Sequence, residues 1–179
     1  MMTTQEYIQL RAFARVDGLY IGILWIASFA CYIGGMSTPL LGTIGGIIAI
    51  VSPFYAGKRL AKFRDEIRDG IISGKRSMFY YALMFFYASI IFALAQYIYF
   101  AFIDGGYLMR QYISMLSTSE MQEALKVYGM NANEMTQALK EFADSSPIMT
   151  ALNIMTMNIT VGLLLSLPVA LITRRSPRQ

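Results

Sequence analysis

Few side chains in this sequence are of the types that perform catalysis, and most of them lie in one segment. Asp65, Glu66 and Asp69 stand close together, and paired carboxylates can serve as general acid and base. Arg64 and Arg68 are their neighbours, so ion pairing explains these carboxylates without a reaction. The chain has no histidine, which removes the commonest general base and metal ligand. We therefore predict no catalytic residue, no metal site and no cofactor, and expect a protein that is not an enzyme.

A second set of polar side chains lies inside the most apolar parts of the sequence. Asn153, Thr156 and Thr160 recur at helical spacing and form one polar stripe, while Asn158 lies off it. Gln96 supplies a further amide in another apolar segment. Polar side chains are costly in lipid unless they hydrogen-bond, so the stripe and Gln96 should face the interior of a helix bundle. They form either interhelical hydrogen bonds or a substrate path, and the second interpretation predicts a polar cavity between two membrane helices.

The composition that surrounds these residues is that of a membrane protein. Apolar residues make up 56% of the 179, mean hydropathy is +0.48, and only 15% of residues are charged. A soluble domain carries roughly 25% charged residues, so this chain has too little polar surface for a water-facing globule. The single cysteine, Cys31, lies in an apolar run and is interpreted as a packing residue. The sequence pI near 9.2 reflects membrane topology, and no nucleic-acid partner is expected.

Four apolar segments predict an all-α integral membrane protein with a single membrane domain over residues 1–179. They cover about 16–33, 40–56, 78–103 and 148–172. Each approaches the roughly 20 residues that cross a hydrocarbon core of about 30 Å, where only helices satisfy their own backbone. No Ala-x-Ala type cleavage site follows the first segment, so we expect it to be retained. Asp17 is expected at a helix end within reach of water, which leaves no charge deep in any span.

The distribution of basic residues predicts the orientation. Twelve of the fifteen Lys and Arg lie in the N-terminal stretch, in the link 57–77 and in the tail that holds Arg174, Arg175 and Arg178. The outer segment 104–147 holds only three. Because loops rich in Lys and Arg stay in the cytoplasm, the prediction is an N-in/C-in topology with a cytoplasmic link and an extracytoplasmic outer segment.

The cytoplasmic link carries an amphipathic pattern. Leu60, Phe63, Ile67 and Ile71 recur at helical spacing, and charged residues occupy the other faces. This pattern favours a basic interfacial helix on the inner membrane surface, where anionic headgroups attract Lys and Arg. The alternative is that the second membrane helix continues into the cytoplasm.

The outer segment is predicted to form a helical hairpin. It contains two apolar stripes, and Gly129 separates them. Ser117-x-x-Glu120 is a capping box that would begin the first helix, and Asn131-x-x-Glu134 would begin the second. The stripe residues that would dock a partner are Met121, Leu125, Tyr128, Met135, Leu139 and Phe142.

Small residues predict where helices approach closely. Gly42-x-x-x-Gly46, with Ala49, gives the second helix a smooth face that suits either a partner helix or intramolecular packing. The short connection before Pro39 predicts a tight hairpin of the first two helices. Pro53 lacks an N–H and crowds the carbonyl of Ala49, which predicts a kink or a helix end.

The order of these motifs resembles one known family. Phe63-Arg64-Asp65-Glu66 leads to Gly70 and to Ile72-Ser73-x-Lys75; a long aromatic helix then ends in Phe102-Ile103-Asp104. An acidic, Met-rich outer segment and a final helix that ends in basic residues follow. This layout is similar to that of small multi-pass inner-membrane proteins of Bacteroidota, a domain-of-unknown-function family numbered 4199. The resemblance implies the bacterial inner (cytoplasmic) membrane and no activity; proximity of relatives to a lipid-linked sugar glycosyltransferase implies a role beside such an enzyme.

Two hypotheses of function follow. The first is a non-enzymatic accessory or assembly subunit of envelope or lipid-linked glycan biogenesis, surrounded by membrane lipids, whose outer hairpin binds a protein partner or a second copy. The alternative is a small transporter or lipid-handling protein that uses the polar stripe and Gln96.

Overall fold

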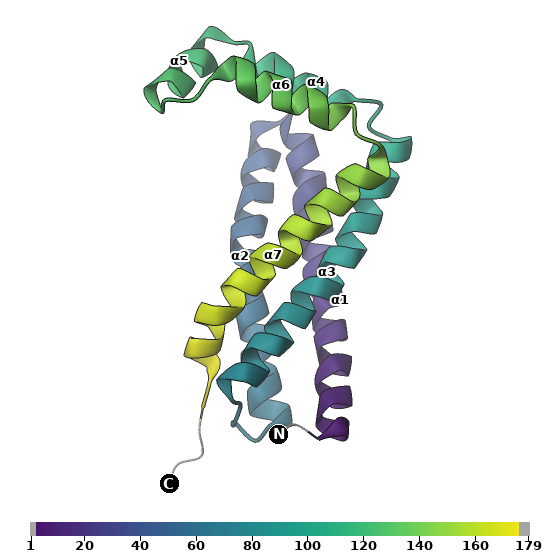
Figure 1. Ribbon diagram of the computed structural model, residues 1–179, viewed down its shortest axis with the longest axis vertical. Helices are drawn as coiled ribbons and strands as arrows, with labels where there is room; N and C mark the ends of the chain where they lie inside the picture. Colours follow the sequence, from purple (N-terminus) through teal and green to yellow (C-terminus); the bar gives the residue numbers. More distant parts are fainter. Residues whose placement is uncertain (1–2, 176–179) are drawn as a thin grey trace. The chain divides into compact units, whose positions relative to one another are not determined.

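The computed structural model describes residues 3–175, which fold into helices joined by short turns (Figure 1). The helices are α1 (Thr4–Gly35), α2 (Pro39–Ile67), α3 (Gly74–Phe102), α4 (Tyr107–Leu116), α5 (Ser119–Val127), α6 (Ala132–Ala143) and α7 (Pro147–Thr173). Four of them, α1, α2, α3 and α7, are long and apolar enough to cross a membrane. The prediction of an all-α, multi-pass membrane protein is therefore confirmed. Arg178, which the orientation argument used, lies outside the described residues.

The chain packs as two compact units. The first takes in the described residues up to Leu94 and from Ile154 onward, and the second is Ala95–Asn153. The helices α3 and α7 each pass from one unit to the other. The first unit holds most of the buried core, including Ile21, Leu60 and Tyr81.

The first helix begins much earlier than the apolar segment that predicted it. Thr3 caps it: the Thr3 hydroxyl accepts from the Glu6 N–H at 3.2 Å, and the Glu6 carboxylate accepts from the Thr3 N–H at 2.9 Å. The polar turns that follow add nothing to hydropathy, so the apolar pattern underestimates the helix. As a consequence Asp17 lies inside α1 and is only 3% exposed, and the prediction that water reaches it is wrong.

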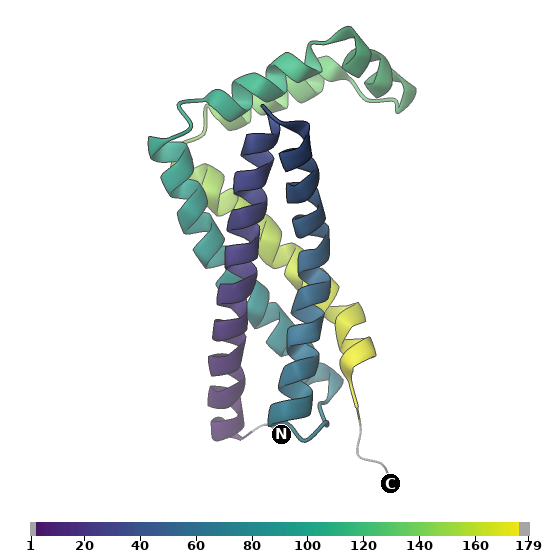
Figure 2. The same ribbon diagram turned by 180° about the vertical axis from the view of Figure 1, so that it is seen from behind.

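The helices α1 and α2 form the predicted tight hairpin, and they run side by side in Figures 1 and 2. Glycines let their backbones meet. A Cβ atom on Gly35 would lie 2.5 Å from the Cα of Gly42, and one on Gly45 would lie 2.8 Å from the carbonyl oxygen of Ser28. The Ser28 hydroxyl donates to the carbonyl of Gly45 at 2.8 Å across the same contact. A larger residue at either glycine would push the two helices apart.

A second close contact joins α1 to α3, and it depends on a motif that the sequence analysis missed. Gly18-x-x-x-Gly22 in α1 has the same spacing as the motif in α2. A Cβ atom on Gly18 would lie 2.7 Å from the carbonyl oxygen of Met84, and one on Gly22 would lie 3.2 Å from that of Ala88. Gly162 of α7 likewise lies against the ring of Phe85. Small residues therefore set the spacing of three helix pairs in the first unit.

The helix α2 continues without a break to Ile67, so the prediction of a separate interfacial helix is wrong. The first part of the link 57–77 is a continuation of the second membrane helix. Leu60 is 0% exposed and Phe63 is 4% exposed. The ring of Phe63 stacks on Tyr80 at 4.4 Å between centroids and lies 5.5 Å from Phe13. Two residues of the stripe that suggested contact with lipid, Leu60 and Phe63, thus pack inside the helix bundle, whereas Ile71 is exposed. Periodicity alone does not distinguish these two environments.

Pro53 lies inside α2, which continues through it. The missing N–H of Pro53 leaves the carbonyl of Ala49 without its helical partner. The Ser52 hydroxyl donates to that carbonyl at 2.9 Å. Serine side chains commonly restore the bonding that a proline removes from a membrane helix.

The second unit contains α4, α5 and α6. Ser117 is the C-cap of α4, and Thr118 is the N-cap of α5, where it accepts from the Met121 N–H at 3.4 Å. The predicted capping box at Ser117 is therefore one residue out of place. Asn131 caps α6 as predicted, and Gly129 adopts a φ of +69°, a left-handed conformation that favours glycine. The main helix contact of this unit is between α4 and α6, so the predicted pairing of the two striped helices, α5 and α6, is wrong.

Candidate functional site

A buried ion pair joins the first three helices. One oxygen of Asp17 accepts from Arg59 Nε at 2.7 Å and from Arg59 Nη2, and the other accepts from the Tyr80 hydroxyl at 2.5 Å. Asp17 and Tyr80 are 3% and 0% exposed. The guanidinium of Arg59 also lies 5.0 Å from the ring centre of Tyr20, a favourable cation–π distance. The sequence signal for this cluster was an acidic residue at the edge of an apolar run, which membrane helices rarely carry without a function or a partner.

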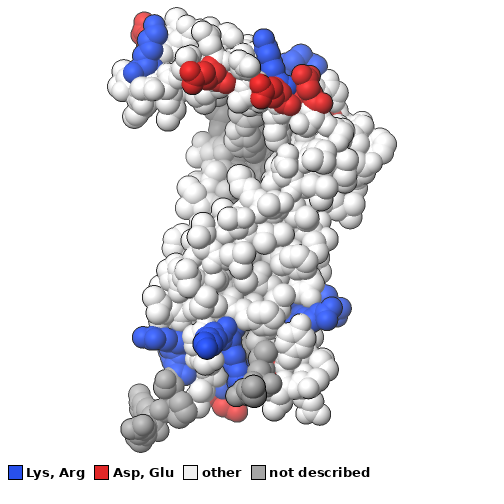
Figure 3. Space-filling model, viewed as in Figure 1, with Lys and Arg blue, Asp and Glu red and all other residues white. Residues whose placement is uncertain are grey.

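The ion pair belongs to a larger group of charges at one end of the first unit, which we call the basic end (Figure 3). Its residues are Glu6, Asp17, Arg59, Arg64, Asp65, Arg68, Arg76 and Arg175. Glu6 of α1 accepts from Arg68 and from Arg76, each at 2.9 Å. The carboxylate therefore ties the start of α1 to both sides of the turn between α2 and α3.

Arg64 closes the basic end against α7. The residue is 6% exposed, its Nη1 donates to the carbonyl of Thr173 at 2.9 Å, and its other nitrogens donate to Asp65 at 2.7 and 2.8 Å. Thr173 ends α7, where backbone carbonyls lack helical partners and attract a cation. Beyond it, Ile72 and Arg175 exchange backbone hydrogen bonds of 3.2 and 3.0 Å. These carboxylates and guanidinium groups are engaged with one another, and their arrangement holds helices together.

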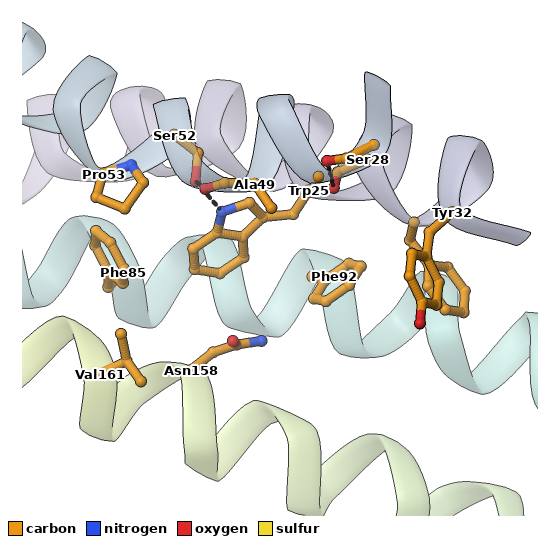
Figure 4. Close-up of a pocket in the computed structure, with 13 residues that line it drawn as sticks. Trp25, Ser28, Tyr32, Ala49, Ser52, Pro53, Phe85, Phe92, Asn158 and Val161 are labelled. Carbon is orange, nitrogen blue, oxygen red and sulfur yellow. Dashed lines mark hydrogen bonds between the residues drawn. The ribbon is translucent and has the colours of Figure 1, made fainter. Parts of the chain in front are cut away.

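A cavity of about 400 Å³ opens between α1, α2, α3 and α7 within the first unit (Figure 4). Five aromatic side chains line it: Trp25, Phe29, Tyr32, Phe85 and Phe92. Trp25 meets Phe85 and Phe92 edge to face, with centroids 5.2 and 5.9 Å apart. None of the described lining residues is charged. The cavity is therefore suited to an uncharged molecule.

Hydrogen bonds engage three of the donors in the cavity wall, those of Trp25, Ser28 and Ser52. Trp25 Nε1 donates a hydrogen bond to the Ser52 hydroxyl at 2.8 Å, and that hydroxyl in turn donates one to the carbonyl of Ala49. The Ser28 hydroxyl is bound to Gly45. The side-chain nitrogen of Asn158 is buried and makes no hydrogen bond within the described residues. In Figure 4 this amide points from α7 toward Trp25 and Phe92.

The predicted polar stripe does not supply this amide. Thr156 and Thr160 are exposed on α7, where the Thr160 hydroxyl donates to the carbonyl of Thr156 at 2.9 Å. Asn153 is exposed in the second unit, and Gln96, also in that unit, is 3% exposed. The polar stripe is thus on a different face of α7 from the cavity, because helical spacing groups side chains but does not determine which group faces inward. A role for the stripe stays a prediction.

The residues predicted to pack helices lie in two different environments, the contact with α1 and the wall of the cavity. Gly42 meets Gly35 of α1, as intramolecular packing requires. Gly46 and Ala49 line the cavity, and a Cβ atom on Gly46 would meet nothing within 4 Å. Gly45, which directly precedes Gly46, approaches α1 more closely than Gly42 does.

The predicted docking residues differ widely in exposure. Leu125 is 8% exposed, and Tyr128 and Met135 are 77% and 39% exposed. Met121, Leu139 and Phe142 are half-buried. Val127 and Met130, which were not among the predicted docking residues, are 83% and 52% exposed and flank Tyr128. They lie off the helical stripe because the helix ends there and the chain turns.

Among residues 3–175, no group of three or more His, Cys, Asp and Glu side chains lies close enough to hold a metal ion. No curated protein matches the chain, and neither does any solved structure. The family model described as "Protein of unknown function (DUF4199)" matches residues 17–175, a range that holds every residue of the cavity and the whole Asp17 cluster. The chain therefore belongs to the DUF4199 family of proteins of unknown function.

Proposed function

We propose that the protein is a non-enzymatic accessory or assembly subunit of a bacterial inner membrane that acts in envelope or lipid-linked glycan biogenesis. It works by contact with a protein partner or with a second copy. One observation carries the proposal: Val127, Tyr128 and Met130, which we call the apolar tip, are large apolar side chains that the second unit leaves exposed.

The chemistry of the apolar tip supports a contact function. The tip lies at the turn between α5 and α6, and the surrounding helices are rich in polar and charged residues. An exposed apolar group with a polar rim is typical of a protein-interaction site. Tyrosine and methionine are both enriched in the centres of such interfaces. Gly129 adopts the left-handed conformation of the turn that follows Tyr128 and precedes Met130.

The proposal predicts that Tyr128→Asp abolishes the interaction with the partner. A charge at the centre of an apolar contact must be desolvated without a counter-charge, which costs several kcal/mol. The measurement is co-purification from membranes of the natural host after gentle extraction, with bound proteins identified and the oligomeric state determined by native mass spectrometry. Asn133→Asp is the matched control, because it adds the same charge at an exposed position of the same unit. Equal recovery of partner with both variants would contradict the contact function.

The proposed orientation places both ends and the basic end in the cytoplasm and the apolar tip outside. We expect Glu123→Cys, in a Cys31→Ser background, to react with a membrane-impermeant maleimide in intact spheroplasts. Lys62→Cys in the same background should react only after the membrane is opened. Cys31 is the one native cysteine, so each variant reports one position. The reverse pattern would overturn the orientation and move the docking surface to the cytoplasm.

The second candidate is a small transporter or lipid-handling protein, with roles for Gln96, Asn153, Thr156 and Thr160. The specific observation in its favour is the cavity, whose amide donor is Asn158. Ligand binding to this cavity is the first requirement of that candidate.

A further inference from the structure

We propose that a groove between α1 and α2 binds one anionic phospholipid, with an acyl chain in the groove and the phosphate at Lys58 and Lys62. We call it the hairpin groove, and its wall includes Tyr20, Ile23 and Leu24 of α1 and Ile47, Val51 and Tyr55 of α2. The groove belongs to the first unit and the apolar tip to the second, so this inference goes beyond the proposed partner contact and does not depend on it.

The first argument is the position of the hairpin groove. It has a volume of about 500 Å³, and the described residues that line it all belong to α1 or α2. Gly18 and Gly22 contact α3, and each is two residues from Tyr20, which therefore projects from the opposite side of α1. Figure 2 shows the hairpin from a side where α3 and α7 lie behind it. In a bilayer the groove is therefore open to the acyl chains of lipids.

The second argument is the change of polarity along the hairpin groove. Because α1 and α2 are antiparallel, Tyr20 and Tyr55 lie at the same end of the groove, and Ile47 lies at the other. The guanidinium of Arg59 lies at the tyrosine end, 5.0 Å from the ring centre of Tyr20. From Ile47 to Tyr55 the groove runs about 12 Å, at about 1.5 Å per residue. An apolar groove that ends in tyrosines suits an acyl chain that leads to a polar headgroup.

The third argument is the positive charge beyond the tyrosine end. Lys58 and Lys62 lie seven residues after Val51 and Tyr55, which is about two turns along the same face of α2. Both lysines are exposed. Basic residues at the ends of membrane helices attract the headgroups of anionic lipids. The two lysines therefore stand where the phosphate of a lipid in the groove would lie.

The neighbouring carboxylates leave part of this charge uncompensated. Asp17 neutralises Arg59 in the buried ion pair. Glu66 lies 3.8 Å from Lys62, but both side chains are more than half exposed, and such pairs contribute little. Lys58 has no ion pair or hydrogen bond with another residue of the described range 3–175. A phosphodiester carries one negative charge, so a lipid phosphate complements this site.

The test is native mass spectrometry of the full-length protein after exchange into a neutral detergent. The protein is titrated with dioleoyl phosphatidylglycerol and, separately, with dioleoyl phosphatidylcholine, which has the same chains on a zwitterionic headgroup. We expect one phosphatidylglycerol to bind more tightly than further copies do, and more tightly than phosphatidylcholine. This first binding step is the quantity compared among variants.

One pair of double variants tests the phosphate contact. Lys58→Gln/Lys62→Gln should weaken the first binding step about 5- to 30-fold, the effect of one to two lysines near an anionic headgroup. Lys75→Gln/Arg174→Gln is the matched control, because it removes the same charge from exposed positions that lie outside α1 and α2. The control should bind phosphatidylglycerol as the native protein does.

A second pair of variants tests the acyl-chain contact. Val51→Trp fills the hairpin groove and should weaken the first binding step at least 10-fold. Ile50→Trp makes the same kind of change at the preceding residue, which is 69% exposed and does not line the groove, and it should leave binding unchanged. Unchanged melting temperatures establish that the variants remain folded.

Three results would overturn the proposal. Equal binding of the two lipids, or equal binding by the two double variants, would mean that Lys58 and Lys62 do not recognise the phosphate. Displacement of the lipid by glycerol 3-phosphate would mean that the site takes a soluble phosphate without a chain. A dimer that binds no lipid and that Val51→Trp dissociates would mean that a second copy covers the groove. These outcomes concern α1 and α2, whereas the contact function is tested at Tyr128, so the two failures are distinguishable.

Discussion

Asp17→Ala is expected to lower the free energy of unfolding by about 3 kcal/mol, because it leaves the Arg59 guanidinium partly buried without its counter-charge. Removal of one partner from a buried pair costs about 3–5 kcal/mol, and the 24% exposure of the Arg59 side chain places this case at the lower end. Tyr80 also loses the acceptor of its hydroxyl. The measurement is equilibrium unfolding in mixed micelles, followed by the fluorescence of Trp25.

The double variant Asp17→Leu/Arg59→Leu is the control for this prediction. It removes both charges, and apolar replacements of a whole buried pair are often neutral. We therefore expect it to recover most of the lost stability, with a coupling energy of about 2 kcal/mol between the two positions. The single variants Asp17→Leu and Arg59→Leu complete the cycle. If the double variant lost as much stability as these two single variants together, the interaction between the two charges would not stabilise the contact of α1 with α2.

Gly18→Ile is expected to destabilise the protein by about 3 kcal/mol or to prevent its folding, since overpacking that must move backbone lies at the upper end of such effects. The new Cβ atom would lie 2.7 Å from the carbonyl oxygen of Met84 and 2.7 Å from the Cβ of Tyr87. Neither atom belongs to the flexible end of a side chain, so α1 and α3 have to separate. The measurement is the yield of monodisperse protein and its melting temperature after extraction.

Gly46→Ile provides the matched comparison, because it makes the same substitution in a helix where the new Cβ atom meets nothing within 4 Å. We expect a normal yield and a melting temperature within a few degrees of the native value. Equal damage at both positions would mean that the cost comes from the β-branched side chain itself and not from helix contact.

The membrane architecture could be predicted from sequence because it depends on quantities that residues carry by themselves. Apolar length decides whether a helix can span the bilayer, and each predicted span coincides with one long helix, the third extending one residue beyond α3. The hairpin of α1 and α2 followed in the same way from a short connection. Helix ends were harder to predict from the sequence: the polar turns from Thr4 onward belong to α1 although they add nothing to hydropathy.

The environment of each helix face could not be predicted, because it depends on what lies opposite. Phe63 packs on Tyr80 of α3. The helical spacing of Leu60 and Phe63 would have suited contact with lipid equally well. The stripe of Thr156 and Thr160 and the single amide of Asn158 are both polar sets on α7, and only the position of α1 and α3 decides which set meets the cavity. Gly18 and Gly22 could have been found, since their spacing equals that of Gly42 and Gly46.

The ion pair of Asp17 and Arg59 also constrains how this sequence can diverge. The two positions are 42 residues apart and would be scored as unrelated sites in any residue-by-residue comparison. A substitution at only one of the two positions leaves the other residue as an unpaired buried charge, whereas substitution of both residues does not. Members of the DUF4199 family should therefore keep both residues or lose both, and an alignment in which one persists without the other would show that this junction of α1 and α2 is particular to this chain.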